Sequence, residues 1–210
     1  GPVIYLPAED PPTAIHHRLH ALGAHLSAEE RQAVADGLLI QPLIGSLPNI
    51  MAPEWFDGLK RAAEGRLMVL DTLRRFHIEE ENASGPMAQV IGRMEAIAAD
   101  TGCSIVFLHH ASKGAAMMGA GDQQQASRGS SVLVDNIRWQ SYLSSMTSAE
   151  AEEWGVDDDQ RRFFVRFGVS KANYGAPFAD RWFRRHDGGV LKPAVLERQR
   201  KSKGVPRGEA

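Results

Sequence analysis

The sequence lacks several features that would assign it to a common class. It has a single cysteine, Cys103, among 210 residues, which excludes a disulfide framework and favours a reducing compartment. No run approaches the roughly 18–20 apolar residues that cross a bilayer, and no signal-peptide pattern is present. We therefore expect a soluble, cytoplasmic protein with no membrane partner.

Motifs of several enzyme classes are also missing. The sequence contains no C-x-x-C, H-E-x-x-H or G-x-S-x-G, so these redox, zinc and hydrolase signatures do not apply. It contains no G-x-x-x-x-G-K-[ST] either, the loop whose amides and lysine cradle nucleotide phosphates. The glycine-rich stretch 114–121 has neither the Lys-Ser/Thr ending nor a strand-to-helix setting.

Size and charge limit the organisation of the chain. A hydrophobic content of 43% over 210 residues is enough for one domain with a full core. Residues 161–210 hold 13 Lys/Arg and 4 Asp/Glu, whereas residues 1–160 hold 11 and 22. A basic end on an acidic body indicates an anionic partner, and a solvated basic tail is the alternative. We expect one core over residues 1–196 and a basic flexible tail over 197–210.

Short apolar runs alternate with helical patterns in the first half of the chain. Leu67-Met-Val-Leu-Asp71 is an apolar run that ends in a carboxylate, which is typical of a strand buried on both faces. Other strands are predicted at 3–6, 38–40 and 104–108, and helices at 12–26, 27–37, 53–64 and 86–101. This alternation predicts an α/β fold with a mostly parallel twisted sheet flanked by helices.

The second half of the chain predicts antiparallel strands. A helix is expected at 126–134, strands at 136–143 and 163–169, and an acidic helix and turn at 148–160. Asp187-Gly-Gly189 separates two extended segments, 182–186 and 190–191, as the turn of a hairpin does.

Ionisable residues follow three of the predicted strands: Glu9-Asp10, Asp71-Thr72 and His109-His110. Right-handed crossovers place the carboxyl ends of parallel strands on one edge, where open α/β sheets bind their ligands. A shared site is therefore favoured over three unrelated ends. For Asp71 taken alone, the alternative is a carboxylate that only caps the following turn.

The residue types at these ends suit phosphate chemistry. An Asp after an apolar strand, followed by a hydroxyl residue, is the arrangement that holds hydrated Mg²⁺ in phosphate-cleaving ATPases. A carboxylate on a neighbouring strand end can position or deprotonate the attacking water. Spacing alone does not decide whether Glu9 or Asp10 is that base.

Four segments in order carry a family resemblance: 4–10, 68–76, 106–113 and 127–139. They resemble RecA-type motor domains, members of the RecA-like P-loop ATPase superfamily, and in particular the RepA-type hexameric replicative DNA helicases of broad-host-range plasmids. The resemblance covers essentially the whole chain. Family members carry an amino-terminal P-loop βα unit that these residues lack, so we expect the chain to be a carboxyl-terminal part.

The resemblance implies ATP and Mg²⁺ as cofactors and a role for each motif residue. Glu9 matches the catalytic Glu, Asp71 with Thr72 the metal-binding Walker B position, and His110 the γ-phosphate sensor. Arg138 matches the arginine finger, which reaches the nucleotide of a neighbouring subunit in a homo-oligomeric ring, a hexamer in this family.

The resemblance also implies where single-stranded DNA is held. Loops 74–86 and 111–125 would face the central channel of the ring, and Arg75, Lys113 and Arg128 are the candidate backbone contacts. The expected function is ATP-driven translocation on single-stranded DNA and duplex unwinding in plasmid replication. Two alternatives stay open: a RecA-like ATPase for recombination or regulation without unwinding, and a non-enzymatic binding or assembly module, which the missing P-loop favours.

Overall fold

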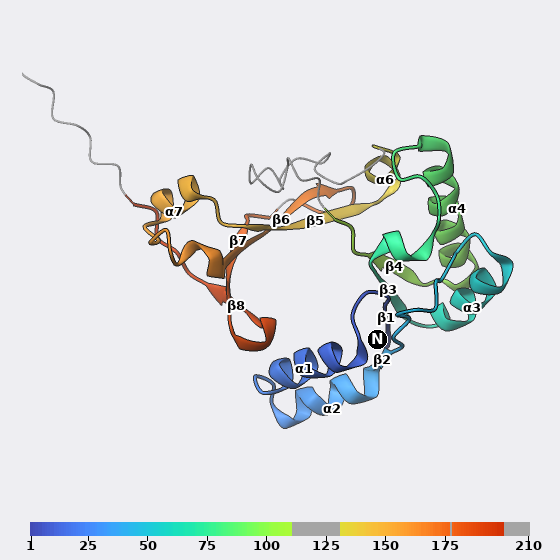
Figure 1. Cartoon of the computed structure of the whole chain (residues 1–210), viewed down its shortest axis with the longest axis horizontal. Helices are drawn as coiled ribbons and strands as arrows, with labels where there is room; N and C mark the ends of the chain where they lie inside the picture. Colours follow the sequence, from blue (N-terminus) through green and yellow to red (C-terminus); the bar gives the residue numbers. More distant parts are fainter. Residues whose placement is uncertain (111–130, 177, 200–210) are drawn as a thin grey trace, which may run out of the picture.

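The computed structural model describes residues 1–110, 131–176 and 178–199. Its described residues form two four-stranded sheets (Figure 1). The first sheet has the order β2-β1-β3-β4 with every neighbouring pair parallel. The second has the order β5-β6-β7-β8 with every pair antiparallel. The α/β fold with a parallel sheet and antiparallel carboxyl-terminal strands is confirmed.

The parallel sheet follows the predicted alternation of strands and helices. Its strands are β1 (Val3–Pro7), β2 (Leu38–Ile40), β3 (Leu67–Asp71) and β4 (Ser104–Phe107). The connecting helices are α1 (Pro12–Gly23), α2 (Ala28–Gly37), α3 (Pro53–Ala63) and α4 (Ser84–Thr101). None of the described helices is long and apolar enough to cross a membrane.

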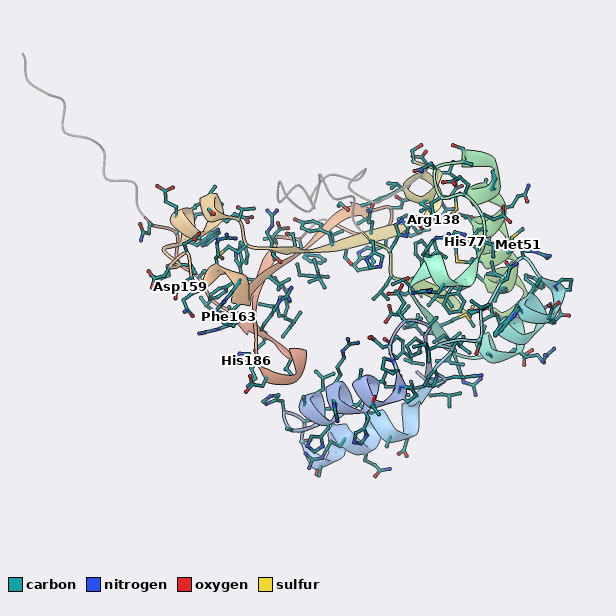
Figure 2. The ribbon with its side chains drawn as sticks, viewed as in Figure 1. Met51, His77, Arg138, Asp159, Phe163 and His186 are labelled. Carbon is teal, nitrogen blue, oxygen red and sulfur yellow. The ribbon has the colours of Figure 1, made fainter. Side chains whose placement is uncertain are left out.

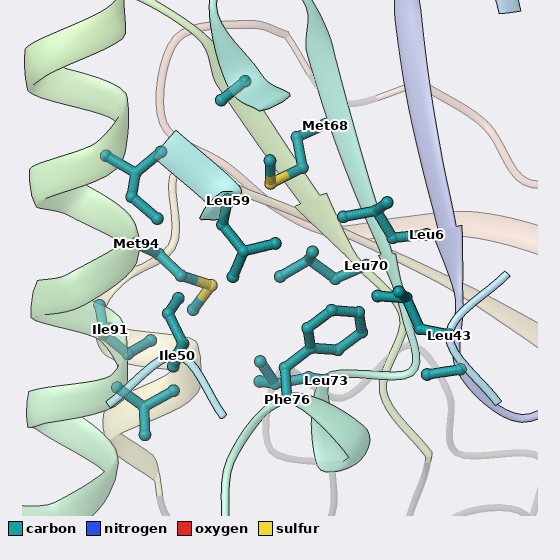
Figure 3. Close-up of a cluster of buried hydrophobic side chains, with 14 of the residues drawn as sticks. Leu6, Leu43, Ile50, Leu59, Met68, Leu70, Leu73, Phe76, Ile91 and Met94 are labelled. Atoms are coloured by element: carbon teal, nitrogen blue, oxygen red, sulfur yellow. The ribbon is translucent and has the colours of Figure 1, made fainter. Parts of the chain in front are cut away.

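The main core lies between one face of the parallel sheet and helices α3 and α4 (Figure 3). Alternate strand residues point to this face, and the short 3-10 turn η1 (Leu73–Phe76) completes it. Burying one such side chain is worth about 1.5–3 kcal/mol, so this face anchors the strand ends. Its members with at most 2% exposure include Ile4, Leu6, Met68, Leu70, Leu73 and Phe76.

Helix α4 begins two residues before the predicted start at Pro86. Pro86 is the third residue of the helix, where its missing N–H is one of the first four that have no intrahelical acceptor. The helix ends as predicted, because Gly102 adopts a left-handed conformation with φ of 69°.

Short helices precede the second sheet and connect some of its strands. Its strands are β5 (Trp139–Ser145), β6 (Phe164–Ala172), β7 (Arg181–Arg185) and β8 (Leu191–Ala194). The helices are α6 (Ser131–Asn136), α7 (Ser148–Trp154), η4 (Arg161–Phe163) and η5 (Asp187–Gly189). A smaller core forms beneath it from Met146, Ala151, Phe164 and Trp182.

The predicted boundary between helix and strand at 134–136 is wrong by a few residues. Helix α6 continues to Asn136 and β5 starts at Trp139. The ammonium of Lys171 donates to the carbonyls of Val134 and Asp135, at 2.7 and 3.0 Å. A cation on the last carbonyls favours the helical end, and this long-range contact has no local sequence signal.

The predicted domain limits concern the end of the chain. Arg198 pairs with Glu153 at 3.1 Å, and the amide of Gln199 donates to the Glu153 carbonyl at 2.9 Å. Two residues of the predicted tail thus contact α7, while residues 200–210 lie outside the described residues. The boundary at 196 stays a prediction.

Candidate functional site

Backbone hydrogen bonds hold three strand ends side by side beyond the last paired residues. The amide of Ala8 donates to the Asp71 carbonyl at 2.7 Å, and the amide of Leu108 donates to the Leu70 carbonyl at 2.9 Å. The amide of Leu73 returns to the Leu108 carbonyl at 2.8 Å. The residues that follow β1, β3 and β4 therefore share one edge, as the sequence predicts.

Glu9 is the centre of a polar network at this edge. Its Oε1 accepts from the Thr72 hydroxyl at 3.2 Å and from Arg75 Nε at 3.1 Å. Its Oε2 lies 3.9 Å from His110 Nε2. One carboxylate thus connects the ends of β1, β3 and β4, and four of the predicted site residues come together.

The exposure of these side chains sets the strength of the network. Thr72 is 5% exposed, whereas the side chains of Glu9 and Arg75 are 34% and 54% exposed. An ion pair in contact with water is worth about 0.2–1 kcal/mol. Arg75 is therefore held on Glu9 weakly enough for another anion to compete for it.

Asp71 has a partner that the sequence analysis missed. The Tyr5 hydroxyl, from the neighbouring strand β1, donates a hydrogen bond to Asp71 Oδ2. Burial, followed by this hydrogen bond and the charge of Asp71, raises the pKa of Tyr5, so its hydroxyl stays protonated and remains a donor. The Asp71–Thr72 peptide bond is cis.

A register argument explains this contact. Tyr5 pairs with Val69 and Pro7 pairs with Asp71, so Tyr5 and Asp71 lie on the same face of the sheet, two residues apart in register. That face is opposite the core, and a half-buried tyrosine needs a partner for its hydroxyl. The sequence did contain a sign of this contact: Tyr5 is the one residue of β1 with a hydrogen-bonding side chain, and it alternates with the core residues Ile4 and Leu6.

The two carboxylates after β1 have separate partners. Asp10 forms an ion pair with Arg18 of α1, whereas Glu9 contacts the ends of β3 and β4. Arg18 is a second residue that the sequence analysis missed. Its position eight residues after Asp10, across the start of a helix, has no simple periodic signal.

Arg138 directly precedes β5 of the second sheet and does not join this network. Its guanidinium donates to the Asn136 carbonyl at 3.0 Å, and it lines a cavity of about 260 Å³ together with Trp139, Tyr174 and Phe178. Figure 2 shows Arg138 at the end of the sheet that adjoins α6. Its predicted action on a neighbouring subunit stays a prediction, and Lys113 and Arg128 lie outside the described residues.

The donor set at the edge fits a hydrated Mg²⁺ that is shared with phosphate oxygens. Within residues 1–110, 131–176 and 178–199, no group of three or more His, Cys, Asp or Glu side chains gathers to hold a metal ion. Hydrated Mg²⁺ needs only one or two carboxylates when phosphates supply further ligands. Asp71, with Oδ2 engaged by Tyr5, leaves Oδ1 for such a role.

Comparisons with known proteins agree with this fold. A family model described as an AAA domain matches residues 1–116. A solved structure described as an ATPase domain aligns with a TM-score of 0.63 at 13% identity, covering 90% of this chain and 74% of that one. The RadB recombinase aligns with a TM-score of 0.50 at 15% identity, covering 90% and 77%. At these identities the structural matches establish the RecA-like fold alone.

Proposed function

The chain belongs to the AAA domain family with a RecA-like P-loop ATPase fold, and from this we propose that it functions in an ATP-dependent replicative DNA helicase of the RepA plasmid type. ATP hydrolysis at the interfaces of a hexameric ring drives translocation on single-stranded DNA and unwinding. One observation carries the proposal: Glu9 bonds to Thr72 and Arg75 and lies beside His110, at the edge that also holds Asp71.

Each side chain at the edge has a separate task in this proposal. Glu9 Oε2, the oxygen that faces His110, orients the attacking water and accepts its proton. Asp71 would hold Mg²⁺, with Tyr5 fixing the orientation of its carboxylate through Oδ2. His110 contacts the γ-phosphate, and Arg138 acts on the nucleotide of the adjacent subunit. Bound Mg²⁺–ATP supplies the phosphoryl group and the metal charge that stabilises its transfer.

The phosphate cradle is not among these residues. No G-x-x-x-x-G-K-[ST] occurs in the 210 residues, and the amides and lysine of that loop hold the β- and γ-phosphates in P-loop enzymes. We therefore propose hydrolysis only for a protein in which this loop is also present. The residues described above would contribute the Mg²⁺ ligand and the base that activates water.

Arg75 links the site to the proposed DNA contacts. Arg75 follows Arg74 in η1, and its Nε donates a hydrogen bond to Glu9, the carboxylate proposed as the base. When a DNA phosphate draws Arg75 away, Glu9 Oε1 loses a hydrogen-bond donor, and the carboxylate is free to turn toward the attacking water. Lys113 and Arg128 complete the proposed backbone contacts. Binding of single-stranded DNA would then raise the rate of ATP hydrolysis.

A second candidate keeps the ATPase and removes the unwinding. The fold is shared with a protein named as a recombinase, so an ATPase for recombination or regulation is the alternative. Strand displacement on forked DNA separates the two, since only a helicase releases the displaced strand in an ATP-dependent reaction.

The test is DNA-stimulated ATPase activity of the complete protein with single-residue variants. Glu9→Gln and Asp71→Asn should each lower kcat at least about 100-fold, because general-base catalysis contributes about 10²–10⁴ and the metal ligand is lost. Glu152→Gln, at an exposed position of α7, is the control and should retain full activity. Full activity in Glu9→Gln and Asp71→Asn would reject the assignment.

A further inference from the structure

A basic pocket lies away from the strand-end site, where the β7–β8 hairpin meets the end of α1. The pocket has a volume of about 520 Å³. It is lined by three cations, one carboxylate, two histidines and a phenylalanine: Arg184, Arg185, Lys192, Asp187, His25, His186 and Phe163. Phe163 and His186 mark this region in Figure 2. None of its lining residues belongs to the strand-end site.

A glycine fixes the geometry of this junction. Turn η5 packs against α1, and Gly188 in that turn has φ of +69°. A Cβ atom at Gly188 would overlap the Cβ of Ala21, so the turn approaches α1 more closely than any other residue allows. The pocket is thus built by close backbone packing between two distant parts of the chain.

The cations of the pocket outnumber its one carboxylate, Asp187, and form no ion pair with it among the described residues. Arg184 on β7 lies directly opposite Lys192 on β8, and like charges at opposed positions destabilise a sheet. In the described part of the chain, neither of these residues nor Arg185 has a carboxylate within 4.0 Å. An anion bound between the strands would remove this repulsion.

The remaining features of the pocket favour an extended polyanion. Most of its lining residues are exposed, so it is open and does not enclose a small molecule. The half-buried ring of Phe163 lies at one side, with the guanidinium of Arg162 4.9 Å from the ring centroid. Cations that track phosphates, combined with an aromatic ring and arginine stacking, are characteristic of single-strand binding.

We propose that this pocket, the α1–hairpin basic pocket, binds phosphate groups of single-stranded nucleic acid. It provides a contact beyond those of the proposed motor, from a different sheet and independent of nucleotide hydrolysis. Arg184, Arg185 and Lys192 neutralise successive phosphates, and Phe163 offers a face to a base.

The experiment measures binding of a fluorescein-labelled oligo(dT) to the complete protein without nucleotide, by anisotropy between 50 and 200 mM salt. The variants are the double change Arg184→Ala with Lys192→Ala, and Arg185→Ala alone. We expect the double variant to weaken binding about 5–20-fold and to reduce the salt slope by about 1 for each phosphate that is no longer neutralised. The control is Arg181→Ala, an exposed cation on the same strand that stacks on Phe178.

Three results would overturn the proposal. One is wild-type affinity and salt slope in both variants. Another is equal weakening in Arg181→Ala, which would indicate only general charge. The third is loss of binding to anionic phosphatidylglycerol vesicles with unchanged oligonucleotide binding. Thermal unfolding of each variant confirms folding, and the more conservative Arg184→Gln repeats the test where the double variant is unstable. ATPase activity is measured in a separate experiment. A negative result there would reject the motor assignment without changing the interpretation of oligonucleotide binding.

Discussion

The hydroxyl of Tyr5 on β1 donates to the carboxylate of Asp71 at the end of β3, so the proposed metal ligand is oriented by a side chain from the adjacent strand. Residues that orient a metal ligand typically change metal affinity 10–100-fold when they are removed. We predict that Tyr5→Phe raises the Mg²⁺ concentration for half-maximal ATPase activity of the complete protein about tenfold, with a smaller effect on kcat.

Tyr142→Phe is the matched control for this substitution. Tyr142 makes the same kind of bond, to Asp180 Oδ2 at 2.6 Å, on the second sheet. Both variants lose a tyrosine–carboxylate hydrogen bond and should lose stability by about 1 kcal/mol. Only Tyr5→Phe should shift the Mg²⁺ titration, and an equal shift in both would show that the effect is structural.

The Arg75–Glu9 pair predicts how DNA stimulates hydrolysis. Arg75→Ala removes the donor from Glu9, so the rate without DNA should rise about 2–5-fold, the equivalent of an exposed ion pair worth about 0.5–1 kcal/mol. The rate with saturating DNA should change less, and the stimulation ratio should fall. Arg75→Lys retains a cation and should retain most of the stimulation. An unchanged ratio in Arg75→Ala would contradict the coupling.

His77 predicts a pH dependence of stability. This residue is 3% exposed, and burial followed by the charge of Arg74 lowers its pKa from the usual value of 6.5. The unfolded chain therefore takes up the proton at higher pH than the folded chain, and stability falls as the pH drops below 6.5. One proton contributes at most about 1.4 kcal/mol per pH unit.

Urea unfolding between pH 7.5 and 5 measures this slope. His77→Gln removes the titrating group and should flatten the curve, although it lowers stability at every pH because the site is buried. His17→Gln, at an exposed position of α1, should keep the wild-type slope. A slope that survives in His77→Gln would assign the effect to another group.

Substitution of two adjacent glycines distinguishes the cost of a strained backbone from the cost of a steric clash. Gly188 and Gly189 have φ of +69° and +79°, but only at Gly188 does a Cβ meet another atom. Gly189→Ala should cost about 1–2 kcal/mol for the left-handed conformation alone. Gly188→Ala should cost about 1–3 kcal/mol more, because the methyl group overlaps Ala21. Equal losses in chemical denaturation would mean that the turn moves away from α1 at little cost.

The parallel sheet and its strand-end residues were predictable because they depend on local patterns. Apolar runs that end in Glu9, Asp71 and His110 specify strands, and parallel connections bring the ends together without further information. The partners of these residues were less accessible. To predict that Tyr5 contacts Asp71, one must know the register of β1 against β3. To predict that Arg18 pairs with Asp10, one must know the path of the chain between β1 and α1.

The second sheet shows the limit of local patterns more clearly. The start of β5 depends on Lys171, which caps α6 from a strand far along the chain. The basic residues of β7 looked like part of a generally cationic end. Only the pairing of Arg184 with Lys192 and the packing of Gly188 on Ala21 gather them into one pocket.

The turn that carries Arg75 is anchored at both ends. Leu73 and Phe76 are 0% exposed and fix the turn to the core, whereas Arg74 and Arg75 between them are exposed to solvent. Release of Glu9 therefore needs a rotamer change and no loop rearrangement. Exposed side chains rotate in picoseconds to nanoseconds, whereas loops and lids take up to milliseconds. Glu9 would therefore be released almost as soon as a DNA phosphate binds Arg75. Movement of the DNA strand would then be the slower event.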